Sequence, residues 1–195
     1  MDAAQAQLWK ADLKFLDEQI RAQHANPYHQ VGRVQLDTAV EALRERIPQL
    51  ARHQVIVEMA RVLTLVGDGH SSFWMEFNKT LKFHKYPLRF YEFNDGVFVY
   101  EVEAGHRQYL GLRLVAVGKY PVEEALRLVA SAVPRDNEMG VKLGAPHLLS
   151  IPEVLHTFGI IDTLESGEFA CEFILEDAYG ERLTVRPPLL EPQDS

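Results

Sequence analysis

Apolar residues in the first third of the chain recur every three or four positions. The first series contains Trp9, Leu13, Leu16 and Ile20. This spacing places the four side chains on one face of a helix. Residues 24–28 contain an Asn-Pro pair, which is a turn signal, so we expect the helix to end there.

Two more helices follow from the same pattern. The second is expected to begin with Asp37 as its N-cap and to end at Pro48. Its apolar face consists of Leu36, Val40, Leu43 and Ile47. The third has the widest apolar stripe, so it should be the most buried helix, and Gly67 is expected to end it. Its stripe consists of Val55, Ile56, Met59, Val62, Leu63 and Val66.

After residue 70 the helical spacing gives way to runs of aromatic and β-branched residues. Two such runs within residues 88–103 flank Asp95 and Gly96, and an Asp-Gly pair in this setting predicts a β-hairpin. The later elements are expected over residues 112–121 (strand), 121–132 (amphipathic helix), 134–152 (short helices), 151–160 (short helix) and 167–188 (hairpin).

The order of these elements predicts an α+β fold. We expect a helical subdomain over residues 1–70, a β-rich domain over residues 71–188 and a tail over residues 189–195. The chain has 195 residues, of which 47% are hydrophobic, and this is enough to form a core.

The charge pattern and the length of the apolar runs disfavour two classes of partner, nucleic acid and a membrane that the chain would span. The formal net charge is -8 and Lys and Arg form no long cluster, so we expect no binding to nucleic acid. The longest apolar runs fall far short of the ~20 residues needed to span a bilayer. The N-terminal residues lack the apolar stretch of a signal peptide.

The single cysteine, Cys171, lies in an apolar run typical of a buried strand.

Asp68, His70 and Ser71 lie within four positions and contain the residue types of a hydrolase triad. Residues this close in sequence point in diverging directions and do not readily align a Ser-His-Asp hydrogen-bond chain. We therefore favour a turn in which Asp68 bonds nearby amides, Gly69 adopts a positive φ, and His70 locks the turn to the next strand. On this interpretation, replacing His70 lowers stability. A small hydrolase that uses Asp68, His70 and Ser71 is the alternative.

The sequence predicts neither a metal site nor a cofactor. None of the eight histidines has the H-x-x-x-H spacing of a helical zinc site, and a second cysteine is absent. The glycines of residues 67–69 lack the strand, lysine and helix of a phosphate-binding loop.

A strand followed by a hairpin and an amphipathic helix is typical of modules that bind an extended peptide by strand addition. We expect such a groove between residues 88–93 and 121–132. Its candidate contact residues are Leu88, Arg89, Phe90, Leu126 and Val129. In this groove Arg89 would supply a positive charge for a peptide C-terminus. The alternative is a scaffold whose groove is filled by its own side chains.

Several segments resemble one protein family. The sequence LVGDGHSS, residues 65–72, resembles the D-G-H-T/S motif near the N-terminus of many C-terminal-processing, or tail-specific, serine peptidases. Residues 86–126, which contain YPLRFYEFNDGVFVYEVE and LRLVAVGKYPVEEAL, resemble the PDZ-like domain of one branch of that family. Residues 133–138 and 145–160 are similar to the segments that follow, so the resemblance covers roughly residues 9–188. It implies a PDZ-like domain over residues 71–188 and a polypeptide substrate, or its C-terminus, as partner.

The resemblance implies no active site in these residues. Such peptidases use a serine nucleophile and a lysine base on a core domain that follows the PDZ-like domain. The serines present, none in a matching context, are Ser71, Ser72, Ser131, Ser150, Ser166 and Ser195. The chain would then be a non-catalytic portion that binds or gates an extended polypeptide, with an absent catalytic domain as a further partner. A stand-alone structural or interaction module remains the alternative.

Overall fold

The computed structural model describes residues 1–75, 77–190 and 192 and confirms the α+β fold class. Its helices are α1 (Ala3–Gln23), α2 (Arg33–Arg46), α3 (Arg52–Thr64), α4 (Val122–Val129), α5 (Glu138–Leu148) and α6 (Pro152–Thr157). Its strands are β1 (Leu88–Phe93), β2 (Gly96–Val102), β3 (Arg113–Val117), β4 (Tyr120–Pro121), β5 (Phe173–Glu176) and β6 (Arg182–Val185). Short 3₁₀ turns cover Ile47–Gln49, Lys79–Leu81, Arg107–Tyr109 and Ala130–Ala132. Within the described residues, no helix is long and apolar enough to cross a membrane.

Helix α1 follows its apolar spacing closely. Asp2 caps it by accepting a hydrogen bond from the amide of Gln5, 2.8 Å away. Leu13 and Ile20 are buried, and Ile20 lies in the last turn before the predicted Asn-Pro stop.

The expected start of the second helix is wrong. Helix α2 begins at Arg33, and the side chain of Gln35 accepts a hydrogen bond from the amide of Gly32 at 3.0 Å. Asp37 lies inside the helix instead of capping it. Its carboxylate is bound by the guanidinium of Arg21 on α1, 2.7 Å away, so it joins two helices.

Helix α3 has the largest set of buried side chains in the helical part, as its wide apolar stripe predicts. After Thr64, successive turns lead to Gly67, whose amide bonds the carbonyl of Thr64 at 3.1 Å. Gly67 has a φ of +73°, and a Cβ there would lie 2.4 Å from the side chain of Gln30. Glycine is therefore required where the helical turns end.

The strands form one antiparallel sheet in the order β1-β2-β3-β5-β6, with β4 paired to β3. The predicted first hairpin is present, because Phe93 pairs with Gly96 across a turn of two residues. The predicted last hairpin is β5–β6. Strand β1 lies at one edge of the sheet and has an irregular register at Arg89 and Phe90.

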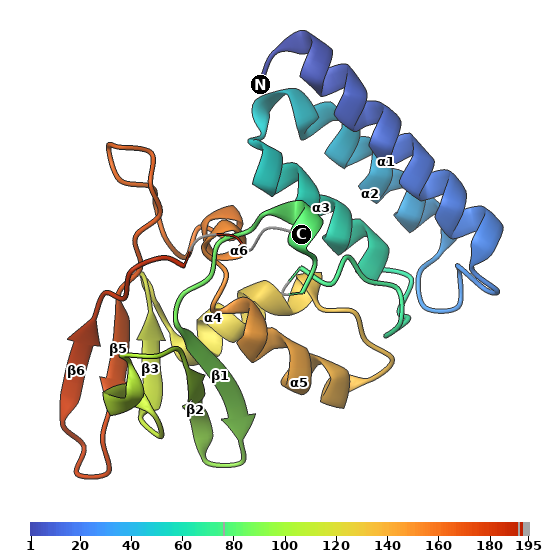
Figure 1. The fold of residues 1–195 in the computed structure, drawn as a ribbon. Coiled ribbons are helices and arrows are strands. Elements are labelled where there is room, and N and C mark those ends of the chain that lie inside the picture. Colours follow the sequence, from blue (N-terminus) through green and yellow to red (C-terminus); the bar gives the residue numbers. More distant parts are fainter. Residues whose placement is uncertain (76, 191, 193–195) are drawn as a thin grey trace.

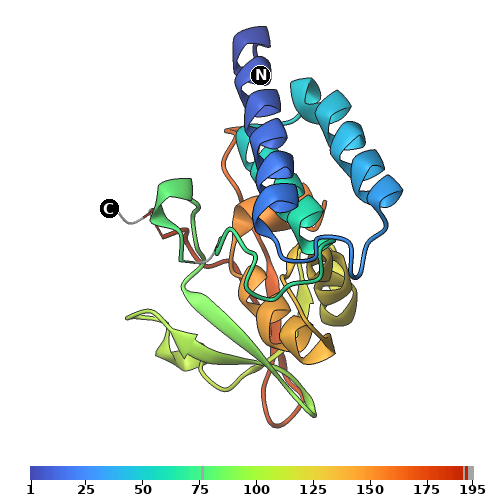
Figure 2. The ribbon, with the colours of Figure 1, turned by 90° about the vertical axis from the view of Figure 1, so that its right-hand side faces the viewer.

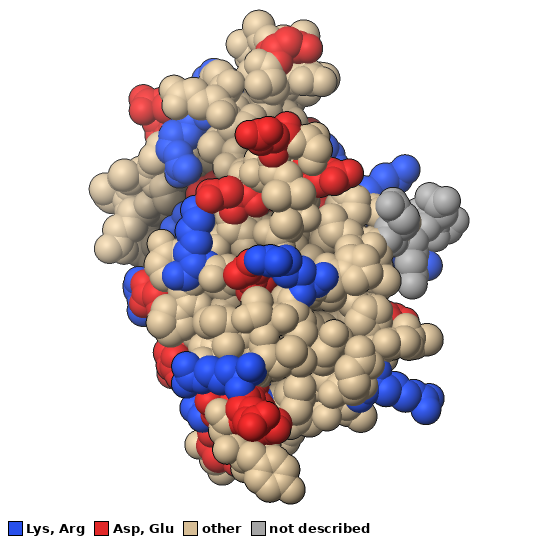
Figure 3. All heavy atoms as spheres, turned by 90° about the vertical axis from the view of Figure 1, so that its left-hand side faces the viewer, with Lys and Arg blue, Asp and Glu red and all other residues tan. Residues whose placement is uncertain are grey.

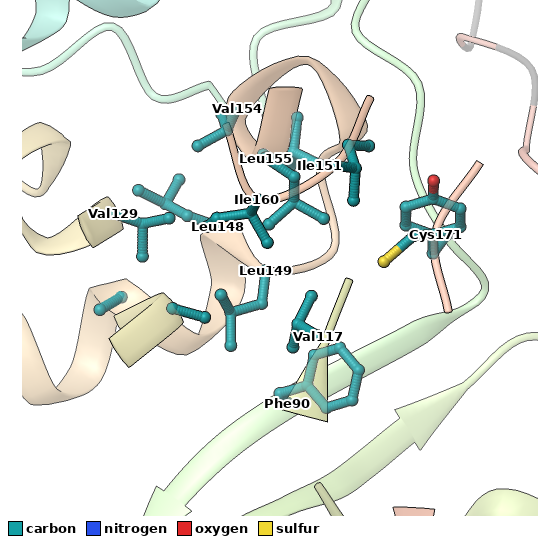
Figure 4. Close-up of a cluster of buried hydrophobic side chains, with 14 of the residues drawn as sticks. Phe90, Val117, Val129, Leu148, Leu149, Ile151, Val154, Leu155, Ile160 and Cys171 are labelled. Carbon is teal, nitrogen blue, oxygen red and sulfur yellow. The ribbon is translucent and has the colours of Figure 1, made fainter. Parts of the chain in front are cut away.

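Helices α4, α5 and α6 lie beside the sheet, and α6 also packs against α3 (Figure 1). Figure 4 shows how their apolar side chains meet those of the strands, with Phe90 of β1 and Val117 of β3 facing Leu149. A second buried cluster lies among α1, α2 and α3. Helix α3 contributes residues to both clusters, so it joins the two halves of the molecule.

Charges of both signs are interspersed on the face drawn in Figure 3. Several ion pairs join arginines and glutamates of strands β3, β5 and β6 and the residues that flank them. Arg182 and Arg113 both contact Glu176, at 3.0 and 3.2 Å, and Arg186 contacts Glu172. Such exposed pairs each contribute little to stability, about 0–1 kcal/mol.

Within the predicted tail, the amide of Leu190 bonds the carbonyl of Lys85 at 2.8 Å, which holds this residue beside the segment that leads into β1. Residues 191 and 193–195 of that tail lie outside the described residues.

Candidate functional site

The edge strand β1 has one buried face and one exposed face. Leu88 and Phe90 have no exposed surface, whereas Tyr91 is 36% and Phe93 48% exposed. Alternation of this kind follows from the strand geometry, in which successive side chains point to opposite faces. The exposed residues belong to a set of aromatic rings in mutual contact, which also includes Phe98 and Tyr100 of β2.

A groove of about 480 Å³ separates the end of β1 from helix α5. Tyr91 and Phe93 line it on the strand side. Met139 and Leu143, which are 69% and 56% exposed, line it on the helix side. Large apolar side chains are therefore exposed on both walls, next to the edge of a sheet.

A second hollow of about 490 Å³ lies on the other side of α5. Its opposite wall is the segment after α3, which passes between α1–α3 and α5 (Figure 2). Gly140 and Leu143 line both hollows, so the apolar surface continues across α5. Trp74, 56% exposed, and Phe77, 63% exposed, add two more large apolar side chains.

Trp74 has an unusual backbone conformation, with a φ of +48°. Its carbonyl accepts hydrogen bonds from the amides of Phe77 and Asn78, each at 2.8 Å, and these bonds hold the turn. Strained backbone of this kind persists only where surrounding contacts hold it in place, and it is often found at functional sites.

A third hollow, of about 300 Å³, continues the path beyond Met75 and Phe77 and is lined by cations. These are Lys79, Lys82, Lys85 and Arg89, and the carboxylates of Glu101 and Glu103 belong to the same lining. The guanidinium of Arg89 bonds Glu101 at 3.0 Å and lies 5.9 Å from the ring of Phe77. Arg89 is thus a side chain of the outer surface, and part of its charge is already matched by a neighbouring carboxylate.

The five predicted peptide contacts do not line a common groove, because four of them belong to the buried core. Leu88, Phe90 and Val129 are fully buried in the core, and Leu126 is half-buried against it. Helix α4 packs against β3, whereas α5 is the helix beside β1. The helix that flanks the edge strand is therefore α5, which the sequence pattern did not select.

Part of the predicted turn is present at residues 68–71. Asp68 accepts a hydrogen bond from the amide of His70 at 3.0 Å and one from the hydroxyl of Ser71 at 2.5 Å. These bonds, the Ser71 bond above all, hold the pKa of Asp68 below its ordinary value, and His24, 3.5 Å away, acts in the same direction.

Two details of the predicted turn are wrong. Gly69 does not have a positive φ. The glycine of this segment with a positive φ is Gly67. A Cβ at Gly69 would lie 2.6 Å from the carboxylate of Asp136 and would displace it from the Gly69 amide, whose hydrogen bond it accepts at 2.9 Å. The side chain of His70 is 93% exposed, and β1 begins only at Leu88, so His70 does not lock the turn to a strand.

The same geometry is not that of a Ser-His-Asp triad. The hydroxyl of Ser71 donates directly to Oδ2 of Asp68, and Nδ1 of His70 lies 3.5 Å from Oδ1, the other oxygen of the same carboxylate. A triad requires histidine between serine and carboxylate. In the part of the chain that the structure describes, no hydrogen bond joins His70 to Ser71.

Other candidate chemistry is weak in the described residues. No group of three or more His, Cys, Asp or Glu side chains there is arranged to hold a metal ion. Cys171 is buried, and burial raises the pKa of its thiol to about 12, so this cysteine is not a reactive nucleophile.

The fold is similar to that of a protease. Neither a protein-family model nor a curated protein matches the sequence. Among solved structures, mature CPAF, a chlamydial serine protease, is similar with a TM-score of 0.64 and 12% identity over 94% of this chain and 34% of CPAF. CPAF complexed with lactacystin gives a TM-score of 0.64 and 12% identity over 94% and 35% of the two chains. A point mutant of CPAF gives 0.62 and 12% over 95% and 34%.

At this identity the comparison establishes a CPAF-like fold. The chain spans about a third of the length of the CPAF chains it matches.

Proposed function

We propose that this chain is the non-catalytic, polypeptide-binding portion of a serine peptidase of the tail-specific type. The observation that carries the proposal is the groove between the edge strand β1 and helix α5, with exposed apolar side chains on both walls. The CPAF-like fold supports the assignment to a peptidase. The proposal keeps a helical subdomain over residues 1–70 and a PDZ-like domain over residues 71–188.

An extended polypeptide would bind by adding a strand to β1. Within the described residues, the strand that pairs with β1 is β2, on one side only. Near the start of β1, residue 150 covers the other side, because its carbonyl accepts the amide of Tyr86 and its hydroxyl donates to Leu88. Beyond Leu88, the side next to the groove has α5 as its neighbour. Main-chain hydrogen bonds would supply affinity there, and apolar side chains of the polypeptide would enter the groove.

The proposal assigns peptide-bond cleavage to a catalytic domain outside residues 1–195. The arrangement of Asp68, His70 and Ser71 supports this assignment, because the serine bonds the carboxylate and not the imidazole. The function of the chain would then be to hold or gate the polypeptide, with Trp74 and Phe77 extending the apolar surface beyond α5.

Calorimetry on the 195-residue chain tests the proposal. The probe is a short peptide with phenylalanine and valine at alternate positions and a free C-terminus, titrated into the wild type and Leu143→Glu. We expect micromolar to millimolar binding to the wild type, and at least a tenfold loss in the variant, because a carboxylate would be placed between the two apolar hollows.

The matched control is Val34→Glu, which changes an apolar residue of α2 that is 76% exposed and lies outside the groove. This variant should bind the peptide as the wild type does. Absence of binding to the wild type at millimolar peptide would contradict the proposal and favour a purely structural module. Ester or peptide hydrolysis lost in both His70→Ala and Ser71→Ala would favour the hydrolase alternative.

A further inference from the structure

Two histidines from distant parts of the sequence bond to each other at the contact between α3 and α6. Nε2 of His53 lies 2.9 Å from Nδ1 of His156. The ring of Phe169 packs against both imidazoles, with centroid distances of 5.4 and 5.5 Å. The pair is therefore partly shielded from water on one side by an aromatic ring.

A hydrogen bond between two imidazole nitrogens needs one donor and one acceptor. A neutral pair satisfies this condition, and so does a pair that has taken up one proton. When both rings are protonated, each of the two facing nitrogens carries a hydrogen, and two positive charges lie in contact. The bond between His53 and His156 cannot survive the second proton.

Charged groups of both signs lie around the pair. Arg52 precedes His53 on α3 and donates to the carbonyl of Leu81 at 2.8 Å, while Asp12 of α1 lines the same hollow as Arg52. On the other side, Lys119 of the β3–β4 turn pairs with Asp162, which follows α6, at 2.5 Å.

Burial is the largest cause of the shift for both histidines, and it lowers both pKa values. Burial, helped by His156 and Arg52, lowers the pKa of His53 to about 4. Burial also lowers the pKa of His156, with Lys119 acting in the same direction and Asp162 against it. On α6, Glu153 is one turn away, but it is bound by His84 at 2.6 Å.

The pair occupies a position where the two halves of the molecule meet. Among the described residues, three other hydrogen bonds join the halves: Arg52 to the carbonyl of Leu81, Thr64 to the carbonyl of Ser131 at 2.7 Å, and the amide of Gly69 to Asp136. None of these three involves a histidine. Of these hydrogen bonds between described residues, the His53–His156 bond is therefore the one that contains histidine and can respond to pH in the mildly acidic range.

We propose that His53 and His156 form a pH-sensitive latch between α3 and α6, closed at neutral pH and opened when both rings are protonated. The latch concerns the joint between the halves and does not rest on polypeptide binding. The direction of the pH effect follows from the pKa values of the two histidines, which are lowered in the folded state. Stability is complete above the ordinary histidine pKa of about 6.5, and it falls as the pH drops from there towards the folded value of His53.

The test follows thermal unfolding against pH for the wild type and for the double variant His53→Gln and His156→Asn. The amide side chains place hydrogen-bonding atoms near the lost ring nitrogens but do not titrate. We expect the melting temperature of the wild type to fall between about pH 6.5 and pH 4 by more than that of the double variant. The control His29→Gln replaces an exposed histidine and should keep the slope of the wild type.

An NMR titration of the wild type gives an independent reading, and it needs no variant to fold. The ring protons of His53 should titrate at least about one pH unit below an ordinary histidine. The protection factors of the α6 amides, taken relative to intrinsic exchange at each pH, should fall over the same pH range. An ordinary titration of His53, or a slope against pH that the double variant leaves unchanged, would overturn the latch.

Discussion

Phe90 and Tyr91 are neighbours in β1 with opposite environments. Phe90 has no exposed surface and contacts the ring of Phe173, whereas Tyr91 is 36% exposed and lines the groove beside α5. The sequence pattern identified this strand correctly, but two of the three peptide contacts that it assigned to the strand, Leu88 and Phe90, lie on the inward face. Alternation alone gives two faces, and only the position of the helices decides which face is buried.

This pair allows stability and binding to be separated. Phe90→Ala should lower the free energy of unfolding by about 3–5 kcal/mol, because a large side chain is lost from the core. Tyr91→Ala should change it by about 1 kcal/mol or less and weaken peptide binding instead. Urea unfolding of both variants measures the difference, and equal losses of stability would contradict the assignment of the two faces.

Asp68 and His70 form a second informative pair. Asp68→Ala should cost about 1–2 kcal/mol, because the amide of His70 and the hydroxyl of Ser71 lose their acceptor. The exposed His70 should tolerate alanine with a change within about 0.5 kcal/mol. Since these hydrogen bonds lower the pKa of Asp68, its contribution to stability is complete above the ordinary carboxyl pKa. The contribution is lost as the pH falls from there through the lower pKa of the folded state. Thermal unfolding of the two variants at neutral and acidic pH checks both statements.

At the scale of elements, helix α5 determines the site and was the hardest to anticipate. Its sequence, EMGVKLGAPHL, contains two glycines and a proline, which weaken every helical signal. In the structure this helix has a clear start, because the side chain of Asn137 caps it by accepting hydrogen bonds from the amides of Met139 and Gly140 at 2.9 and 3.2 Å. By contrast, the regular spacing of α1 and α3 and the Asp-Gly turn of the first hairpin predicted those elements well.

Asn137→Ala should lower stability by about 0.5–2 kcal/mol, because the first turn of α5 loses its cap. The first turn contains Met139 and Gly140 of the groove wall, so binding of the alternating phenylalanine–valine peptide should also weaken. Asn137→Asp, which keeps an acceptor at the helix start, is the matched control and should retain both properties. Calorimetric unfolding and peptide titration measure the two effects. An Asn137→Ala variant with unchanged stability and unchanged peptide affinity would contradict the role of the Asn137 cap in both properties.

At the scale of the whole molecule, α3 is the element that joins the two buried clusters. The α+β class and the order of helices and strands could be predicted from periodicity and turn residues. The groove could not, because its walls come from residues 91–94 and 139–143. Their proximity depends on how α5 packs beside β1, and no local pattern encodes this packing.

The most direct test of this account is amide hydrogen exchange across the sheet with and without the alternating phenylalanine–valine peptide. Strand addition predicts slower exchange at Tyr91–Phe93 of the edge strand β1, with little change in the central strand β3. The Leu143→Glu variant should lose this protection, and Val34→Glu should keep it. Saturating peptide that leaves the β1 amides exchanging as in the free chain would contradict binding by strand addition at the β1–α5 groove.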